Sequence, residues 1–171
     1  MAFWSSANLD PKRQFKFKVT FSRLGTEAQY LAQSAGRPQF TISDGVKVDF
    51  LDKSYHYPGK ITWEPVTIKF VDAVQSSVSK ASYDYLKATG WVENDRIASG
   101  TPNFATISKA RAVAASGVVM VDVIDSEGAI VDSWSLHNAF ITKVALNELD
   151  YAAEGILTAI YTMRYDWASL Q

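Results

Sequence analysis

The stretch ITWEPVTIKF (residues 61–70) holds two strand patterns that face opposite ways. Ile61 and Trp63 are apolar at odd positions, whereas the apolar residues after Pro65 stand at even positions. Successive side chains of a strand point to opposite faces, so this switch requires a bulge or a break. Proline fits such a point because it cannot donate to a strand ladder. We predict a break at Glu64-Pro65, followed by a core strand.

The segment before this break predicts an extended excursion from the core. Asp44-Gly45 is a turn signal, and residues 46–50 alternate apolar and polar residues in the manner of a strand. Pro58-Gly59 marks a second turn just before Ile61. We therefore predict that residues 44–60 form an extended loop, and that residues 1–11 form an N-terminal arm.

Alternation with a period of two recurs along the chain and predicts a mostly β protein. Residues 15–21, FKFKVTF, place Phe15, Phe17, Val19 and Phe21 on one face and polar residues on the other. Together with other strand-like segments, about eight strands are expected. They cover residues 14–23, 28–34, 39–43, 61–70, 117–125, 129–136, 140–146 and 156–165.

One segment has helical spacing. Val74, Val78, Ala81 and Tyr85 recur at intervals of four, three and four residues, and Ser77 offers a cap. We predict a helix near residues 75–88, and a short second helix over 106–115. The expected fold is a single domain, residues 1–171, formed by a small antiparallel β-barrel or sandwich with one flanking helix.

Composition excludes several functional classes. The net charge of −1 argues against a dedicated nucleic-acid binder, although residues 1–24 carry five cations against one acid. The absence of cysteine excludes disulfides and thiolate chemistry. We expect neither a signal peptide nor insertion into a membrane, because the N-terminus lacks a long apolar core and no apolar run approaches 18 residues.

Residues capable of catalysis are present but form no motif. His56 stands between Tyr55 and Tyr57, and His137 lies in a different segment. Asp122, Asp125, Asp150 and Asp166 could pair only through folding, and acids on strand faces are usually solvated. The phosphate-loop, nucleophile-elbow and zinc-protease patterns are absent. We assign no catalytic, cofactor-binding or metal-binding residue, although a small-ligand β-barrel or an enzyme using His56 stays open.

Two blocks together carry a family resemblance. The first is YHYPGKITWEPVTIKFVD (55–72), and the second is SWSLHNAFITKVALNELDYAAEGILTAIYTMRYDWA (133–168). With FKFKVTF (15–21), and in this order, the chain resembles the tail tube proteins of contractile-tailed bacteriophages. The family also includes inner-tube proteins of phage-like contractile injection systems, and the type VI secretion tube protein is a fold relative.

This resemblance implies a structural role without catalysis. Six subunits would form a ring, and rings would stack into a hollow tube inside a contractile sheath, conducting the genome during ejection. Implied partners are other copies of the chain, the sheath, baseplate and terminator proteins, and a tape measure protein and transiting DNA in the lumen, without sequence-specific binding. The implied location is the virion tail, assembled in the host bacterial cytoplasm. The alternative is the inner tube of a bacterial injection system or tailocin, which delivers protein cargo or punctures membranes.

Many strands in a small domain leave sheet edges that must be paired or blocked, and contacts between subunits in a ring would cover them. Aromatic residues are enriched in such contacts. We therefore predict an assembly interface on the N-terminal arm and the excursion. Its candidate residues are Phe3, Trp4, Val46, Val48, Phe50, Tyr55, His56, Tyr57 and Trp63.

Overall fold

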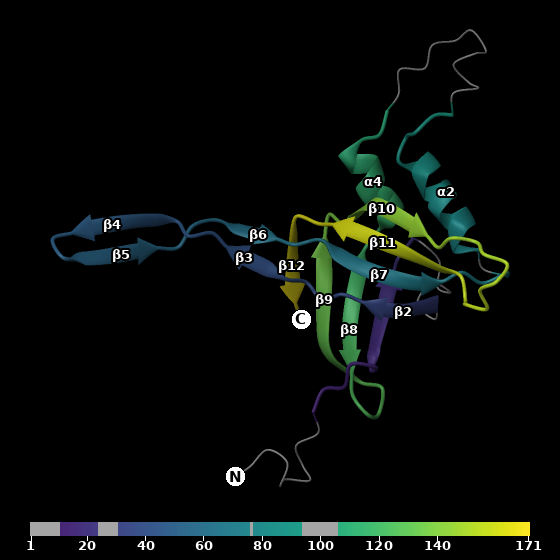
Figure 1. Cartoon of the computed structure of the whole chain (residues 1–171), viewed down its shortest axis with the longest axis horizontal. Coiled ribbons are helices and arrows are strands. Elements are labelled where there is room, and N and C mark those ends of the chain that lie inside the picture. Colours follow the sequence, from purple (N-terminus) through teal and green to yellow (C-terminus); the bar gives the residue numbers. More distant parts are fainter. Residues whose placement is uncertain (1–10, 24–30, 76, 94–105) are drawn as a thin grey trace.

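The computed structural model describes residues 11–23, 31–75, 77–93 and 106–171. Twelve strands and two helices lie in this part of the chain (Figure 1). The strands are β1 (Phe17–Phe21), β2 (Ala32–Ala35), β3 (Phe40–Ile42), β4 (Val46–Phe50), β5 (Lys53–Tyr57), β6 (Ile61–Trp63), β7 (Val66–Val71), β8 (Val119–Ile124), β9 (Ile130–His137), β10 (Phe140–Leu146), β11 (Thr158–Arg164) and β12 (Trp167–Leu170). The helices are α2 (Val78–Ala88) and α4 (Lys109–Ser116).

Two four-stranded antiparallel sheets pack against each other as a sandwich. One has the order β1-β8-β9-β12 and the other β10-β11-β7-β2, and their strands cross steeply in Figure 1. The rings of Phe21 and Phe70, one from each sheet, have centroids 5.7 Å apart. The core between the sheets consists mainly of the inward positions of β1, β7, β8 and β11. Burial of these apolar faces is what holds the two layers together.

The two sheets are joined at a corner where two neighbouring strands bend together. β9 continues into β10 through Asn138, and β11 continues into β12 past Asp166. The Asp166 amide donates to the carbonyl of His137 over 3.0 Å, so the ribbon stays paired through the bend. Asn138 takes a positive φ of 55°, which asparagine tolerates better than most residues.

Side chains fasten this corner from outside. The Asp166 carboxylate accepts a hydrogen bond from the Asn138 amide at 2.8 Å and from Lys109 of α4 at 2.7 Å. The Lys109 bond, followed by the Asn138 bond, lowers the pKa of Asp166 below its ordinary value. The His137 ring stacks on Trp167 with centroids 4.8 Å apart. The second histidine is therefore part of the corner's packing.

Helix α2 lies beside β10 and β11 and is capped as the sequence predicts. The Ser77 hydroxyl accepts from the Lys80 amide, and the Asp72 carboxylate accepts from the Val78 amide at 2.8 Å. These bonds satisfy amides that the first helical turn leaves free. The Tyr85 hydroxyl accepts from the Ile141 amide at 3.0 Å, which ties the helix to β10.

Several details differ from the sequence-based predictions. The sheets are not closed into a barrel, because β1 and β2 face each other without pairing. The predicted eight strands are too few, because the excursion forms β4 and β5, residues 61–70 divide into β6 and β7, and the chain ends in β12. Strand β1 begins at Phe17, which leaves Phe15 74% exposed. Val74 is exposed before α2 begins, and the second helix starts at Lys109 rather than 106.

Two predicted segments reach beyond the described part. Residues 1–10 of the N-terminal arm and residues 28–30 of the second predicted strand lie outside it. The described remainder of that strand begins at Ala32. The break at Glu64-Pro65 is confirmed, since β6 ends at Trp63 and β7 begins in a different sheet. The described part holds no helix of the length and apolarity needed to cross a bilayer.

The first prediction compares two isoleucines on either side of the break. Ile68 is fully buried, whereas Ile61 is 59% exposed. We expect Ile68→Ala to lower the free energy of unfolding by about 2–5 kcal/mol, because it removes buried methyl groups and leaves a cavity. Ile61→Ala is the matched control and should change it by less than about 1 kcal/mol. Urea denaturation of the unassembled protein measures both variants. Equal losses in the free energy of unfolding would contradict the assigned core.

The second prediction concerns acid stability. Because the folded-state pKa of Asp166 is lowered, its stabilisation is present above the ordinary carboxyl pKa near 3.8 and is lost as pH falls through the folded value. The stability difference between the wild type and Asp166→Asn should therefore shrink as pH is lowered from 6 to below 3.8. Lys109→Met removes the main cause and should show the same trend. Denaturation midpoints across this range provide the measurement, and a pH-independent difference would refute the account.

Candidate assembly surface

Residues 40–63 form a two-stranded ribbon, here called the arm, that projects from the sandwich and is longer than the predicted excursion of residues 44–60 (Figure 1). Strands β3 and β6 pair to form its base, and β4 and β5 pair to form its outer half. Residues 50 and 53 pair at the tip, which leaves a two-residue turn. Only the base of the ribbon lies close to the sandwich, so most of the arm has solvent on both faces.

Two glycines let the strands approach where the base meets the outer half. A Cβ placed on Gly45 would lie 2.0 Å from the carbonyl oxygen of Tyr57, and one on Gly59 would lie 2.2 Å from the Ser43 hydroxyl. The Gly59 amide donates to the Ser43 carbonyl at 2.9 Å. No larger residue fits these positions without movement of the backbone. The turn signals in the sequence thus mark a joint inside the arm.

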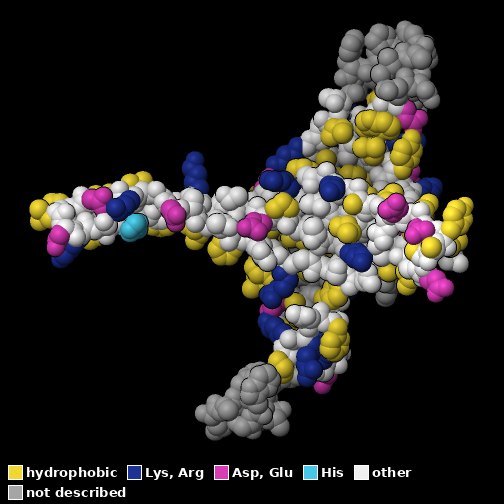
Figure 2. Space-filling view, viewed as in Figure 1, with side chains coloured by type: hydrophobic (Ala, Val, Ile, Leu, Met, Phe, Trp, Pro, Cys, Tyr) yellow, Lys and Arg dark blue, Asp and Glu magenta, His cyan; other side chains and the backbone are white. Residues whose placement is uncertain are grey.

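Apolar residues alternate along both halves of the arm, and hydrophobic side chains are exposed over its length (Figure 2). In the outer half, Val46 stands opposite Tyr57 and Val48 opposite Tyr55. At the base, two further cross-strand pairs continue the same alternation: Phe40 with Trp63, and Ile42 with Ile61. The arm's apolar face is defined as Phe40, Ile42, Val46, Val48, Phe50, Tyr55, Tyr57, Ile61 and Trp63. All of these except Trp63 are exposed, so beyond the Trp63 contact with Tyr165 the face is largely open to solvent in the described chain.

The opposite face of the arm is polar and makes its own contacts. The Ser54 hydroxyl donates to Asp49 over 2.5 Å, and Lys47 lies 3.0 Å from the same carboxylate. These two contacts, the Ser54 bond first, lower the pKa of Asp49. His56 lies on this polar face, opposite Lys47. Because the polar groups contact one another, the apolar face is the one that would gain most from a partner.

The tip of the arm carries an unusual residue. Leu51 takes a positive φ of 54° and its side chain is 89% exposed. Glycine or asparagine is the ordinary choice at such a turn position. The arm itself does not bury this leucine. Leu51 is not among the predicted interface residues, because residues 51–52 carry no turn signal in the sequence.

The root of the arm is attached to the sandwich by aromatic packing. The Trp63 ring lies 5.4 Å from Phe40 across the arm and 5.9 Å from Tyr165 in the corner region, centroid to centroid. The Glu64 amide donates to the Gln39 carbonyl at 2.9 Å. The predicted interface residue Trp63 is therefore half-buried at the root.

The remaining predicted interface residues fall into three groups. Phe3 and Trp4 lie outside the described residues. Five of the others, from Val46 to Tyr57, lie together on the apolar face, whereas His56 lies on the polar face. The sequence analysis missed Phe40, Ile42 and Ile61, which extend the same face. The pairing across the arm was the missing information, because alternation in one strand does not show which strand it meets.

The other polar candidates do not converge on a site. Asp122 is buried and accepts from the Ser133 hydroxyl at 2.5 Å, while Asp125 accepts amides of the following turn. Asp150 accepts from the Ala152 amide within its own loop. Among the described residues, no group of three acidic, histidine or cysteine side chains could hold a metal ion.

Comparison with known proteins gives structural matches without sequence matches. No family model matches the chain, and no curated protein matches it. A chain of the anti-feeding prophage tube-terminating cap superposes with a TM-score of 0.69 at 18% identity, over 98% of this chain and 95% of that one. A chain of the sheath/tube terminator of the extracellular contractile injection system PVC gives 0.64 at 15% identity, over 96% and 99%.

A chain of the PVC sheath–tube complex gives 0.59 at 14% identity, over 94% of this chain and 91% of that one. The chain has the fold of contractile injection system components. The resemblance that the sequence indicated is confirmed at the level of the fold, over almost the whole length of the chain.

A third prediction separates the root of the arm from its outer half. Trp63→Ala removes the ring that joins the arm to Tyr165, and we expect a loss of about 2 kcal/mol in the free energy of unfolding, less than for a fully buried tryptophan. Tyr55→Ala, on the same face but exposed, is the control and should lie within about 0.5 kcal/mol of the wild type. Denaturation of the dispersed protein measures both variants. A larger loss for Tyr55→Ala would show that the outer half packs on its own chain.

Proposed function

We propose that this chain is a structural subunit of the inner tube of a contractile particle. Its rings, hexameric as in the family it resembles, stack into a hollow tube inside a sheath. The observation that carries the proposal is the combination of a contractile-system fold with a projecting arm whose apolar face is exposed beyond Trp63. The apolar surface of such a ribbon stays exposed to water, at a cost in free energy, unless another chain covers it.

The physical properties of the arm suit a contact between copies of the chain. A two-stranded ribbon alone is marginally stable in water, so a long exposed one is best explained by a partner that stabilises it. Aromatic residues on a firm backbone supply contact area at low entropic cost, and Tyr55 and Tyr57 are held by cross-strand pairing. A contact that is not isologous closes a ring when the rotation between copies permits it.

The proposed setting follows from this role. Other copies of the chain are the main partners, with a sheath outside the tube, a baseplate and a terminator at its ends, and a tape measure protein in the channel. The particle would assemble in the bacterial cytoplasm. We propose genome conduction during phage ejection as the cargo role, with protein delivery by an injection system or tailocin as the alternative.

A tube terminator is the second candidate. It is favoured by the structural matches, because the tube cap and the sheath/tube terminator superpose with TM-scores of 0.69 and 0.64 against 0.59 for the sheath–tube complex. A terminator would form a single ring that caps a tube of another protein. Both roles are structural, and we propose no catalysis, because His56 is exposed on the arm and stands opposite Lys47, outside any enclosed site.

Electron microscopy of the purified protein tests the proposal. Hollow tubes support the inner-tube role, and single rings that do not stack support the terminator role. Val48→Asp with Tyr55→Asp places two charges on the apolar face and should abolish the assemblies while leaving the circular dichroism spectrum unchanged. Lys47→Ala with His56→Ala, on the opposite face of the same strands, is the matched control and should still assemble. A wild-type protein that stays monomeric at high concentration would refute both roles.

A further inference from the structure

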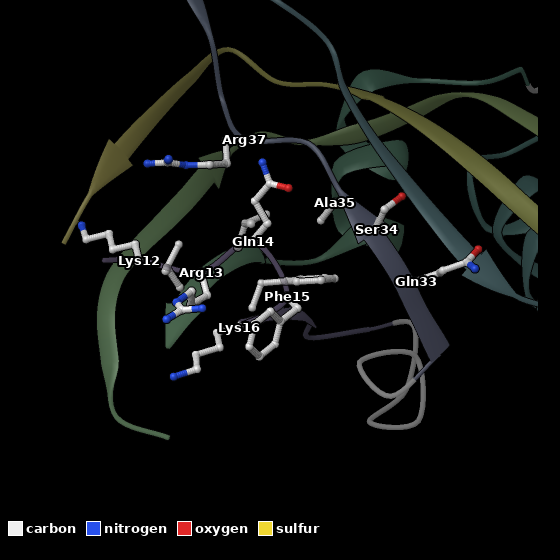
Figure 3. Close-up of a pocket in the computed structure, with 12 residues that line it drawn as sticks. Lys12, Arg13, Gln14, Phe15, Lys16, Gln33, Ser34, Ala35 and Arg37 are labelled. Atoms are coloured by element: carbon white, nitrogen blue, oxygen red, sulfur yellow. The ribbon is translucent and has the colours of Figure 1, made fainter. Parts of the chain in front are cut away.

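The sandwich is open along one side, between strands β1 and β2. Each of these strands pairs with only one neighbour in the described part of the chain, β1 with β8 and β2 with β7. Between them lies a cavity of about 690 Å³. Figure 3 shows Gln14 and Phe15 on one side of it and Ser34 and Ala35 of β2 on the other. Unpaired strand edges offer free amides and carbonyls to a second chain.

The chemistry of this cavity, here called the β1/β2 groove, is apolar with a cationic rim. Phe15, Phe17, Ala35, Val121 and Val123 supply the apolar lining. Lys12, Arg13, Lys16 and Arg37 lie around it, and among the described residues that line the groove there is no carboxylate. This combination selects a segment that is both apolar and acidic.

The cations differ in their availability. Lys12 is already paired with Asp132, and Arg13 has an interaction within the chain. Lys16 donates to the Ser126 hydroxyl at 3.0 Å; because this acceptor is neutral, the bond does not neutralise the positive charge of Lys16. Arg37 is exposed, and among the described residues it has no ion-pair partner. Arg37 and Lys16 are therefore the charges that a partner would meet.

A segment of the required chemistry is present elsewhere on the chain, in the loop between β10 and β11. This acidic loop, residues 147–157, carries Glu148, Asp150 and Glu154 without a cation. Its apolar residues Leu149, Tyr151, Ile156 and Leu157 are all exposed. Such a cluster of exposed apolar side chains needs a partner surface.

The loop is held in place by its own bonds. The Asn147 amide donates to the Thr158 carbonyl, and the Asp72 amide donates to the Leu157 carbonyl at 2.9 Å. The Asp150 side chain accepts from the Ala152 amide at 3.0 Å. None of the loop residues lines the β1/β2 groove of the same chain. The loop is thus presented to solvent in a defined shape, away from the surface that it complements.

We propose that the acidic loop of one copy docks in the β1/β2 groove of the next copy, as a head-to-tail contact within the ring. The contact rests on the proposed function and adds a second interface to it, separate from the arm. Opposite charges would set the register of the two copies, and the apolar residues of the loop would cover the exposed ring of Phe15. A contact between two different surfaces repeats around a ring, as closed rotational symmetry requires.

Cysteine cross-linking tests this contact directly, because the chain contains no cysteine. Ser34→Cys places a thiol in the groove, and Ala153→Cys places one in the loop; both positions are exposed. When the two single variants are mixed and oxidised mildly, a mixed dimer should form, and it can form only between chains. Ser34→Cys mixed with Lys80→Cys on helix α2 is the matched control and should give no more dimer than either variant alone.

Charge reversal supplies a second readout. Arg37→Glu and Glu154→Arg should each lower the fraction of protein in rings about 10-fold at low salt, whereas the combined variant should recover most of it. Lys80→Glu reverses a surface cation outside the groove and should leave the fraction unchanged.

The outcomes separate the two proposals. Wild-type protein without rings refutes the proposed function. Wild-type rings without the mixed cross-link, or with no recovery in the combined variant, refute the docking of the loop alone. If Arg37→Glu leaves rings intact but abolishes retention of an added anionic polymer, the groove has a different occupant and the proposal fails.

Discussion

The structure depends on the switch of apolar face at Glu64-Pro65. Before it, the odd-numbered side chains of β6 belong to the apolar face of the arm. After it, the even-numbered side chains of β7 enter the core. Pro65 ends one ladder without leaving an amide unpaired, and Trp63 fixes the angle between the two parts by packing against Tyr165. If β6 continued into β7 with one face, the apolar side of the arm would be folded into the sandwich and could not meet a partner.

This switch divides the molecule into the sandwich, which buries its own apolar faces, and the arm, whose apolar face is largely exposed. The sandwich buries its apolar faces between its own sheets, and the bent ribbon at Asn138 and Asp166 keeps both layers connected through paired strands. The arm's polar face makes its own contacts while its apolar face stays in water. In the proposed assembly, the core drives folding and the arm makes the contact between copies, so mutations in the two parts should have separable effects.

The β1/β2 groove and the acidic loop also expose apolar surface, and the charges of the two surfaces are opposite. The groove has cations and unpaired strand edges, whereas the loop has acids and exposed apolar side chains. In the proposed assembly, arm, groove and loop together give the subunit more than one contact surface. A tube needs at least two kinds of contact, one within a ring and one between rings, because a single heterologous contact produces either a ring or a filament.

The sequence by itself determined the local structure. Period-two alternation located β1, β7 and β11, helical spacing with Ser77 located α2, and the face switch located the break before Val66. It also placed Val48 and Tyr55 among the candidate contact residues, and that role stays a prediction; short-range pattern depends only on neighbours in the chain. Only the tertiary structure decided that Trp63 belongs to the root, that Phe15 lies in a groove, and that His137 and Asp166 form a corner. These depend on which strands pair across long separations, a choice made by burial of the whole core and not by any single segment.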